Sequence, residues 1–442
     1  MKILQFIFWG GLQIMLHNIT TSRAIIINQL FRFLSGLLFQ VFLTHSALNA
    51  SQVGVFETII FAWVSISFFW VNAFVNVAVV FLNDDLYEKY ISEVFLARQF
   101  LLASVLNFFL AAIFAYFFSP QIFNTAPFTF IFWGAQVFLN ATNFIEPKLI
   151  SENNPQKILE FGVFNLLTPY ILLGALIFLG INSFYAVIIF LAYCSLVSFI
   201  YLSRYINFKI TNFALQKIKT DFIKSVSPLI GYAAANNLTT VFTQSLVLGF
   251  YKTHPDKFAT FRYGVRELPF TIAITNGFGL SAMASLNTEQ GLIDFRENSK
   301  KIMYQIYGLS WVLLLTSQWF IPIIFSEKFN GVIGFFNLNV LLVLSRALMP
   351  QVILRAKNAQ LPILYAGIME TVFIIILSWL LLQKFGAMGV LFAVVLGFLA
   401  EKIILAFILK TKYNIRLKDY TPLKTYLLCS CFTLFLYFLV TR

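Results

Sequence analysis

Long apolar runs alternate with short polar segments along almost the whole chain. A helix needs about 20 apolar residues to cross the roughly 30 Å of hydrocarbon in a bilayer. The pattern therefore predicts an all-α integral membrane protein with 12 transmembrane helices, and a shorter run at 425–440 is the candidate thirteenth. The 12 expected helices lie at residues 24–46, 55–82, 95–118, 127–147, 159–180, 184–203, 225–250, 263–286, 302–325, 332–354, 361–383 and 387–409.

A polar stretch in the middle of the chain, RYINFKITNFALQKIKTDFIK at 204–224, separates six expected helices from six. Transporters built from repeated halves share this layout and bind substrate where the halves meet. We therefore expect two six-helix lobes around a central cavity. The expected division is an interfacial N-terminal segment at 1–23 without a cleavage site, an N-terminal lobe at 24–206, a cytoplasmic linker at 207–222, a C-terminal lobe at 223–410, and a cytoplasmic segment with the candidate extra helix at 411–442.

The distribution of lysine and arginine predicts the orientation in the membrane. If the N-terminus is cytoplasmic, the expected cytoplasmic segments hold 21 lysines and arginines and the opposite side holds 6. Cytoplasmic loops carry an excess of these residues, so we expect a cytoplasmic N-terminus. The net charge of +13, in a chain that is 60% hydrophobic and 11% charged, follows from this asymmetry. Nucleic-acid binding, which needs a basic soluble face, is not expected.

Polar side chains recur every three or four residues in several of the expected helices, and such side chains normally face the interior of a bundle. Interhelical hydrogen bonds, worth ~0.6 kcal/mol each, would explain any single one. Aligned stripes on four helices instead favour a hydrated cavity, in which an aromatic ring such as Trp133 could stack on a sugar. The expected cavity-lining residues are Gln29, Gln40, Asn72, Asn76, Trp133, Gln136, Asn140, Asn143, Asn236, Thr240 and Gln244.

Arginines within the expected helices are the sharpest signal. The segment RYGVRELPFT carries Arg262 and Arg266 four positions apart, where they would share one helix face. Arg32 has no acid at helical spacing in its own helix. An arginine at the centre of a membrane helix costs about 2.5–3.5 kcal/mol, so each needs a partner. One alternative is a structural ion pair with Glu57, Glu267, Glu370 or Glu401. The other is an anionic ligand, and the arginine fork suits phosphate oxygens.

Two glutamates are candidates for ion coupling. Glu57 opens the second expected helix, and Glu370 lies inside the eleventh with no cation one turn away on either side. Burial without a partner favours the neutral form of a carboxyl group. Glu370 would then take up and release a proton during transport. More generally, Glu57 or Glu370 would couple transport to a proton or a sodium ion. The alternative for Glu370 is a neutral glutamic acid bonded to a neighbouring helix.

The residues that support enzymatic chemistry are scattered. The three cysteines, Cys194, Cys429 and Cys431, fall in apolar runs without disulfide or zinc spacing. The three histidines lie far apart in sequence, and no glycine-rich phosphate loop is present. We therefore expect no catalytic residue, no metal, no cofactor and no built-in ATPase.

Two segments resemble a known family of membrane proteins. LTHSALNASQVGVFETIIFAW at 43–63 is similar to the signature of a leucine, small residues and (E/Q)-x-G-x-F that opens bacterial polysaccharide exporters. FRYGVRELPFTIAITNGF at 261–278 resembles the start of the eighth helix in the same proteins. Together with the topology over residues ~20–410, these segments resemble the oligosaccharide (O-antigen type) flippase branch of the multidrug/oligosaccharidyl-lipid/polysaccharide exporter (MOP) superfamily.

The resemblance implies a flippase that moves undecaprenyl-pyrophosphate-linked oligosaccharide from the inner to the outer leaflet of the bacterial inner membrane. Such proteins support lipopolysaccharide and other polysaccharide biosynthesis by alternating access of two lobes around a cationic cavity. Related peptidoglycan-precursor flippases carry arginines in helices one and eight, where Arg32 and Arg266 stand here, with Arg262 just before. These three are the expected pyrophosphate-binding residues. Those relatives usually have fourteen helices, whereas twelve or thirteen are expected here.

Two alternatives to the flippase differ in class. A drug or cation exporter of the same superfamily would need an acidic cavity, whereas the first expected helix offers Arg32 and no acid. A membrane-embedded polysaccharide polymerase would need a sizeable external loop, and the expected external loops are short. The expected partners are the lipid-linked oligosaccharide and a coupling proton or sodium ion. We expect a monomer that associates with glycan assembly proteins.

Overall fold

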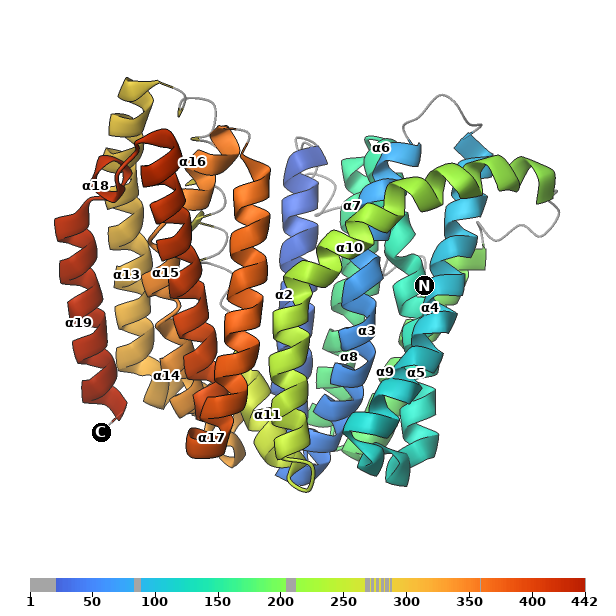
Figure 1. Ribbon diagram of the computed structural model, residues 1–442. Helices are drawn as coiled ribbons and strands as arrows, with labels where there is room; N and C mark the ends of the chain where they lie inside the picture. Colours follow the sequence, from blue (N-terminus) through green and yellow to red (C-terminus); the bar gives the residue numbers. More distant parts are fainter. Residues whose placement is uncertain are drawn as a thin grey trace. The chain divides into compact units, whose positions relative to one another are not determined.

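The computed structural model describes residues 21–82, 89–203, 212–266, 271, 274–275, 278–279, 282, 286, 288–357 and 359–441. Within these ranges, a few side chains, including those of residues 212–218 and 232–236, are not described. All regular structure in the described part is helical (Figure 1), which confirms the expected all-α fold. The expected N-terminal segment, 1–23, lies outside the described residues up to position 20.

The chain forms two compact units. The N-terminal unit comprises the residues through Asn49 and Thr58–Ala234, and the C-terminal unit comprises Ala50–Glu57 and Ala235–Arg442. The first two turns of one helix, α3 (Ala50–Leu82), thus belong to the C-terminal unit, and α10 (Asn212–Phe250) contributes to both. This helix begins inside the expected linker at 207–222, of which residues 207–211 lie outside the described part. The division into two six-helix lobes stays a prediction.

The N-terminal unit is built from apolar helices whose interior is rich in phenylalanine. Phe222 of α10 packs edge to face against Phe74 and Phe95, with ring centroids 5.1 and 5.4 Å away. Besides most of α3 and the first part of α10, this unit contains α2 (Thr21–His45), α4 (Lys89–Phe118), η1 (Pro120–Thr125), α5 (Ala126–Ala141), η2 (Thr142–Phe144), α6 (Ile145–Ser151), α7 (Pro155–Phe161), the π-helical η3 (Gly162–Leu167), α8 (Thr168–Phe178) and α9 (Ser183–Ser203).

The C-terminal unit contains the longest helix, and a glycine divides that helix into two arms. Gly386 has φ 59° and ψ −148°, a conformation open essentially to glycine alone. The two arms of α17 (Gln360–Tyr413) cover the eleventh and twelfth expected helices. The other elements are α11 (Pro255–Gly264), α13 (Glu289–Phe325), η4 (Glu327–Phe329), α14 (Val332–Val340), α15 (Val343–Arg346), α16 (Pro350–Ala356), α18 (Leu417–Tyr420) and α19 (Leu423–Thr441).

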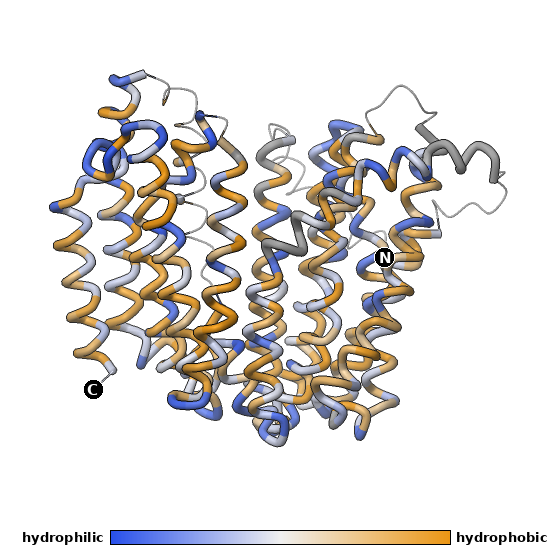
Figure 2. The backbone as a smooth tube through the Cα atoms, in the orientation of Figure 1, coloured by the Kyte–Doolittle hydropathy of each residue, from blue (hydrophilic) through white to orange (hydrophobic). Residues whose placement is uncertain are grey.

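Nine helices of the described part are long and apolar enough to cross a membrane, and a tenth span arises if Val332–Arg346 and Pro350–Ala356, bent by 42°, form one. Hydrophobic positions run along the middle of these helices, and hydrophilic positions gather near their ends (Figure 2). The candidate thirteenth helix, 425–440, is α19, which is among the nine. The eighth expected helix, 263–286, lies largely outside the described residues. The fold is therefore that of a multi-pass membrane protein.

Candidate functional site: arginines within the helices

Arg32 meets a carboxylate in the N-terminal unit. Its Nη2 lies 2.5 Å from Oε2 of Glu146 on α6. The amides of Asn28 and Gln29 donate to Oε1 of the same carboxylate at 2.9 and 3.2 Å. The Glu146 side chain is 5% exposed, whereas that of Arg32 is 36% exposed. The acid is thus held by three donors from two neighbouring turns of α2, while part of the guanidinium still faces the surroundings.

The hydrogen-bonding capacity of Arg32 is not exhausted by this pair. A guanidinium carries five N–H donors, and Glu146 takes one through Nη2. The Nε of Arg32 is buried without a partner in the described part of the chain. An anion that approached the exposed side of Arg32 would therefore find unused donors.

A second group of charges lies near this pair in the sequence. Lys148, two residues after Glu146, contacts Glu93 at 2.9 Å and Glu152 at 3.4 Å. Its side chain is 9% exposed, and that of Glu93 is 11% exposed. Acids on two elements thus neutralise one lysine, which favours a structural role for this group.

Arg262 forms a buried ion pair in the C-terminal unit. Its Nη1 donates to Oε2 of Glu57 at 2.7 Å and to the Glu57 backbone carbonyl at 2.6 Å. The side chains are 14% and 1% exposed. Glu57 was one of the expected candidate partners of these arginines. Because removing one member of a buried pair leaves an uncompensated charge, this contact is a structural element of the unit.

Close backbone approach makes that pair attainable. A Cβ on Gly54 would lie 2.2 Å from the carbonyl carbon of Pro255 and 2.3 Å from its oxygen. Only glycine allows the start of α3 to lie so near the start of α11. The glycine of the sequence signature Gln52-x-Gly54-x-Phe56 therefore has a packing role, since it brings Glu57 within reach of Arg262.

The expectation that Arg262 and Arg266 share a helix face is wrong. Helix α11 ends at Gly264, so Arg262 lies in its last turn and Arg266 lies beyond it. Pro269, four positions after Val265, cannot donate the backbone hydrogen bond that would continue a helix from there. Glu57 and Arg262 nevertheless both act electrostatically on Arg266. The other expected partner, Glu267, lies outside the described residues.

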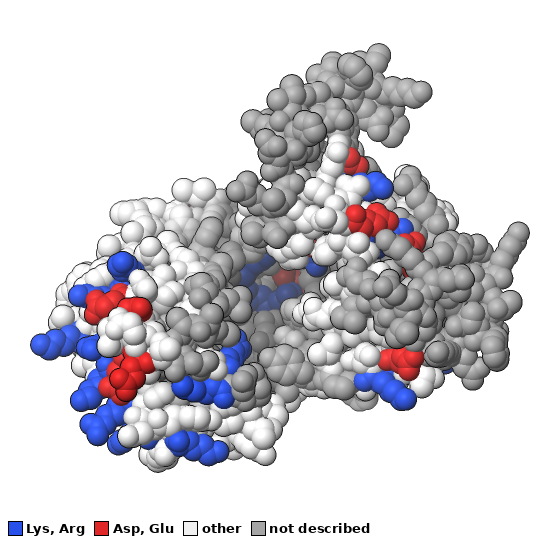
Figure 3. Space-filling model, turned by 90° about the horizontal axis from the view of Figure 1, so that it is seen from above, with Lys and Arg blue, Asp and Glu red and all other residues white. Residues whose placement is uncertain are grey.

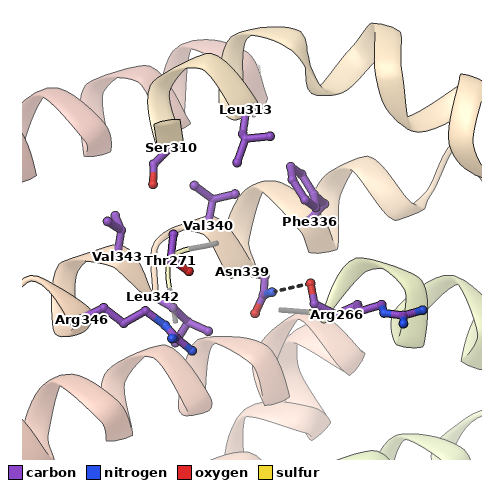
Figure 4. A pocket seen from close by; sticks show the side chains of 10 residues that line it. All are labelled: Arg266, Thr271, Ser310, Leu313, Phe336, Asn339, Val340, Leu342, Val343 and Arg346. Carbon is purple, nitrogen blue, oxygen red and sulfur yellow. Dashed lines mark hydrogen bonds between the residues drawn. The ribbon is translucent and has the colours of Figure 1, made fainter. Parts of the chain in front are cut away.

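Arg266 borders a small internal cavity of about 30 Å³ in the C-terminal unit. The Arg266 carbonyl accepts a hydrogen bond from Nδ2 of Asn339 at 3.5 Å, and its guanidinium points away from Arg346, which lines the same cavity (Figure 4). The volume is enough for one or two water molecules. The backbone of Arg266 is thus fixed, while its charge is directed elsewhere.

Some of the polar side chains expected to line a cavity in the N-terminal unit are exposed, and others are hydrogen-bonded or half-buried. Asn72 and Asn76 are exposed on α3. Asn143 donates to the Asn140 carbonyl at 3.0 Å, and Nδ2 of Asn140 is buried without a partner in the described part. The remaining stripe residues of α2 and α5, Gln40 and Gln136, are half-buried.

Trp133 was expected to line a cavity, but in the structure it is fully buried. Its side chain is 0% exposed, and Nε1 donates to the Ile59 carbonyl at 3.1 Å. The ring packs edge to face against Phe108 and Phe130. It is a packing residue of the N-terminal unit, and stacking on a sugar ring is not open to it in this structure.

The expected residues of the C-terminal unit are described in part. The side chain of Asn236 lies outside the described residues, Thr240 is exposed and Gln244 is half-buried. Glu370 is 9% exposed, as expected for an intramembrane acid. Glu401 and Lys402, on the other arm of α17, act electrostatically on it. Lys402 itself contacts Glu401.

Sequence reasoning missed Glu146 and Asn28. Glu146 stands 114 positions from Arg32, beyond any helical spacing. The proline that follows Glu146 could have indicated a helix start at this point. The structure has one there: η2 ends at Phe144, and the short α6 begins at Ile145 with Glu146 in its first turn. Asn28 lies one turn before Arg32 and could have been added to the polar stripe of its helix.

No family model matches the chain, and no curated protein does. Several solved structures of other proteins have a similar fold. The lipid II flippase MurJ in an inward closed conformation aligns with a TM-score of 0.65 and 17% identity over 95% of this chain and 91% of that one. An inward-facing multidrug resistance MATE family transporter of the MOP superfamily aligns with a TM-score of 0.59 and 13% identity over 91% and 99%.

A MOP superfamily transporter from Pyrococcus furiosus, described as having a binding pocket of reverse polarity, aligns with a TM-score of 0.53 and 13% identity over 90% of this chain and 97% of that one. All three alignments span nearly the full length of both chains. At these identities the likeness is one of fold. The chain therefore has the fold of MOP-superfamily transporters.

Proposed function

We propose that the chain is a flippase that moves an undecaprenyl-pyrophosphate-linked oligosaccharide from the inner to the outer leaflet of the bacterial inner membrane by alternating access. The transporter fold supports movement of a substrate across the membrane. One observation carries the choice of an anionic lipid: Arg32 stays partly exposed, with unused donors, inside a membrane helix. The N-terminus would be cytoplasmic, and the protein would act as a transporter, not as an enzyme.

In this proposal Arg32 and Arg266 each contact the pyrophosphate at some stage of the transport cycle. Arg262 is the outer step of the path. Because Glu57 already occupies its Nη1, Arg262 would bind phosphate by exchanging one oxygen ligand for another. Polar residues, Gln40 and Gln244 among them, would contact the glycan as it crosses the membrane.

The membrane potential supports the direction of transport. An inside-negative membrane potential drives negative charge outward, and moving about two negative charges out across 100 mV releases roughly 4–5 kcal/mol. Glu57 or Glu370 would add coupling to a proton or a sodium ion. The burial of Glu57 in an ion pair makes Glu370 the better candidate.

A drug or cation exporter is the second candidate, since a multidrug transporter has a similar fold. Cation export needs a carboxylate that the substrate can reach. In α2 the only intramembrane charge is Arg32, and its acidic neighbour Glu146 is 5% exposed. The arrangement therefore favours an anion.

Reconstituted vesicles test the proposal. Purified protein is placed in proteoliposomes with a fluorescent polyprenyl-pyrophosphate oligosaccharide, and the outer-leaflet fraction is measured with a glycosidase added outside. We expect translocation by the wild type and at least tenfold slower translocation by Arg32→Ala and Arg266→Ala at unchanged thermal stability. Arg296→Ala, an exposed arginine on α13, is the matched control. Absence of wild-type translocation, together with uptake of a cationic dye, would establish the exporter instead.

A further inference from the structure

The two arms of α17 pack against each other as an antiparallel pair (Figure 1). A Cβ on Gly397 would lie 2.2 Å from Cγ1 of Ile374, so these two positions face each other across the seam between the arms. Helix positions four residues apart share a face. One turn further along each arm, Glu370 therefore stands opposite Glu401. The register of the arms thus places two carboxyl groups at the same level of the seam.

Both acids are buried between apolar layers. Glu370 is 9% exposed and Glu401 is 8% exposed. On one side of them lies the contact made by Ile374. On the other side the next positions of the seam, Ala366 and Leu405, belong to one buried apolar cluster. Because like charges repel strongly in a low-dielectric interior, two such carboxyl groups cannot both stay ionised unless cations neutralise both of them.

Lys402 neutralises only one of the two acids. It contacts Glu401, and the side chains of the two residues are 11% and 10% exposed. Glu401 and Lys402 both act electrostatically on Glu370. With both acids ionised, the three groups carry a net charge of −1. One bound proton makes the group of three neutral.

The other charges near the seam lie on one side of it. In the C-terminal unit α17 packs against α14, α15 and α16, and a hydroxyl contact of 2.9 Å between Thr239 and Thr371 joins it to α10. Helix α14 and the part of α10 in this unit carry no charged residue. Arg346 of α15 and Arg355 of α16 line the same cavity as Lys402. Among the described residues, the carboxyl pair thus has cations toward this cavity and uncharged helices toward α10 and α14.

The cavity brings water close to the pair. Its volume is about 380 Å³, enough for several water molecules, and it lies where α15 ends, the chain bends and α16 begins. Phe398 and Lys402 of the second arm of α17 form part of its wall. Within the C-terminal unit, α16 and α18 lie at the same end (Figure 1), and basic side chains gather on that end, interspersed with acidic ones (Figure 3). Water in the cavity can therefore reach Lys402, whose partner belongs to the pair.

We propose that Glu370 and Glu401 form a carboxyl pair that holds one proton. Two facing carboxyl groups release their protons in two separate steps, and each step belongs to the pair and not to one residue. Lys402 favours the ionised form of Glu401, so the proton resides mainly on Glu370. A metal ion would need several further oxygen ligands, whereas the neighbouring layers of the seam are apolar. The role of this pair in transport rests on the proposed function, to which it adds Glu401 and Lys402.

Infrared spectroscopy of the purified full-length protein in nanodiscs tests the proposal, because a protonated carboxyl group has a carbonyl band of its own. Spectra are recorded between pH 5 and pH 9. We expect a carboxyl band in the wild type that disappears as the pH rises and that is absent from Glu370→Gln. Glu327→Gln, which removes an exposed acid on η4, is the matched control.

The two other members of the group should shift this titration in opposite directions. In Glu401→Gln, Lys402 is free to neutralise Glu370, so the band should disappear at a pH lower by about one unit, a tenfold change in proton affinity. In Lys402→Met neither acid has its contact cation, so the band should persist to a higher pH than in the wild type. Lys410→Met, which removes an exposed lysine in the last turn of α17, is the control for the second variant.

The outcomes separate this inference from the flippase proposal, since the titration needs no substrate. A pair that titrates as expected in a protein without translocation would leave the proton site standing and overturn the flippase. A band that Glu370→Gln leaves unchanged, or a wild-type titration in both Glu401→Gln and Lys402→Met, overturns the pair. Saturable loss of the band on addition of sodium at constant pH and ionic strength would identify a sodium site and overturn the assignment of a proton.

Discussion

Arg32 on α2 and Glu146 on α6 are joined by an ion pair in which the acid is buried and the base is partly exposed. The asymmetry matters because Asn28 and Gln29 also donate to Glu146. The carboxylate would keep two of its three donors if Arg32 were lost. Arg32, by contrast, has no other ion-pair partner among the described residues.

Arg32 could neutralise Glu146 or bind phosphate, and a double variant distinguishes these two roles. If it only neutralises Glu146, then Arg32→Ala/Glu146→Gln should restore any stability and transport that Arg32→Ala loses. We expect both variants to keep the stability of the wild type and transport to stay at least tenfold reduced, because the double variant still lacks the arginine that binds phosphate. Thermal unfolding in detergent and vesicle translocation measure the two effects. Full recovery of transport in the double variant would assign Arg32 a structural role alone.

Removing the charge of Arg262 alone should destabilise the protein more than removing the charges of both Arg262 and Glu57. Arg262→Ala leaves the carboxylate of Glu57 buried, at a cost of about 3–5 kcal/mol. Arg262→Ala/Glu57→Gln removes both charges and should recover a large part of that loss. The midpoint of thermal unfolding of the purified protein checks this order. Equal midpoints for the single and the double variant would contradict a buried pair.

Gly54→Ala should also destabilise the protein, by about 1–3 kcal/mol, because the added methyl group meets backbone atoms that cannot move aside. Gly134→Ala is the matched control, since a Cβ there has nothing within 4 Å and alanine favours a helix. Expression level and unfolding midpoint are the measurements. A Gly54→Ala protein as stable as Gly134→Ala would show that α3 and α11 do not approach so closely.

Glu370→Gln should remove the dependence of translocation on pH. Glu370 is buried and Gln cannot exchange a proton, so we expect the wild-type rate to vary between pH 6 and 8 and the variant rate to stay constant. Proteoliposomes with matched internal and external pH provide the measurement. Glu327→Gln, on η4, serves as the control. A variant with the wild-type rate and profile across this range would exclude proton coupling at this residue.

The fold could be predicted from the sequence to a large extent, because lipid makes helix length and hydrophobicity the dominant constraints. The partners of the buried charges could be predicted only in part. Glu57 was one of four candidate acids for the arginines, and the structure pairs it with Arg262. Glu146 was not, because its distance from Arg32 in sequence gives no periodic signal. The end of α11 at Gly264 was also missed, since the apolar residues on both sides of it predict one continuous helix.

The pairing of Glu57 with Arg262 also has a consequence for biosynthesis. The two residues are 205 positions apart, so at 5–20 residues per second the ribosome needs roughly 10–40 s to supply the arginine after the glutamate. During that interval the nascent chain holds an acid inside, or at the edge of, the bilayer without its counter-ion. The first two turns of α3 can join their unit only after α11 emerges. Chains whose translation stalls before residue 262 therefore carry Glu57 without the counter-ion that it has in the folded protein.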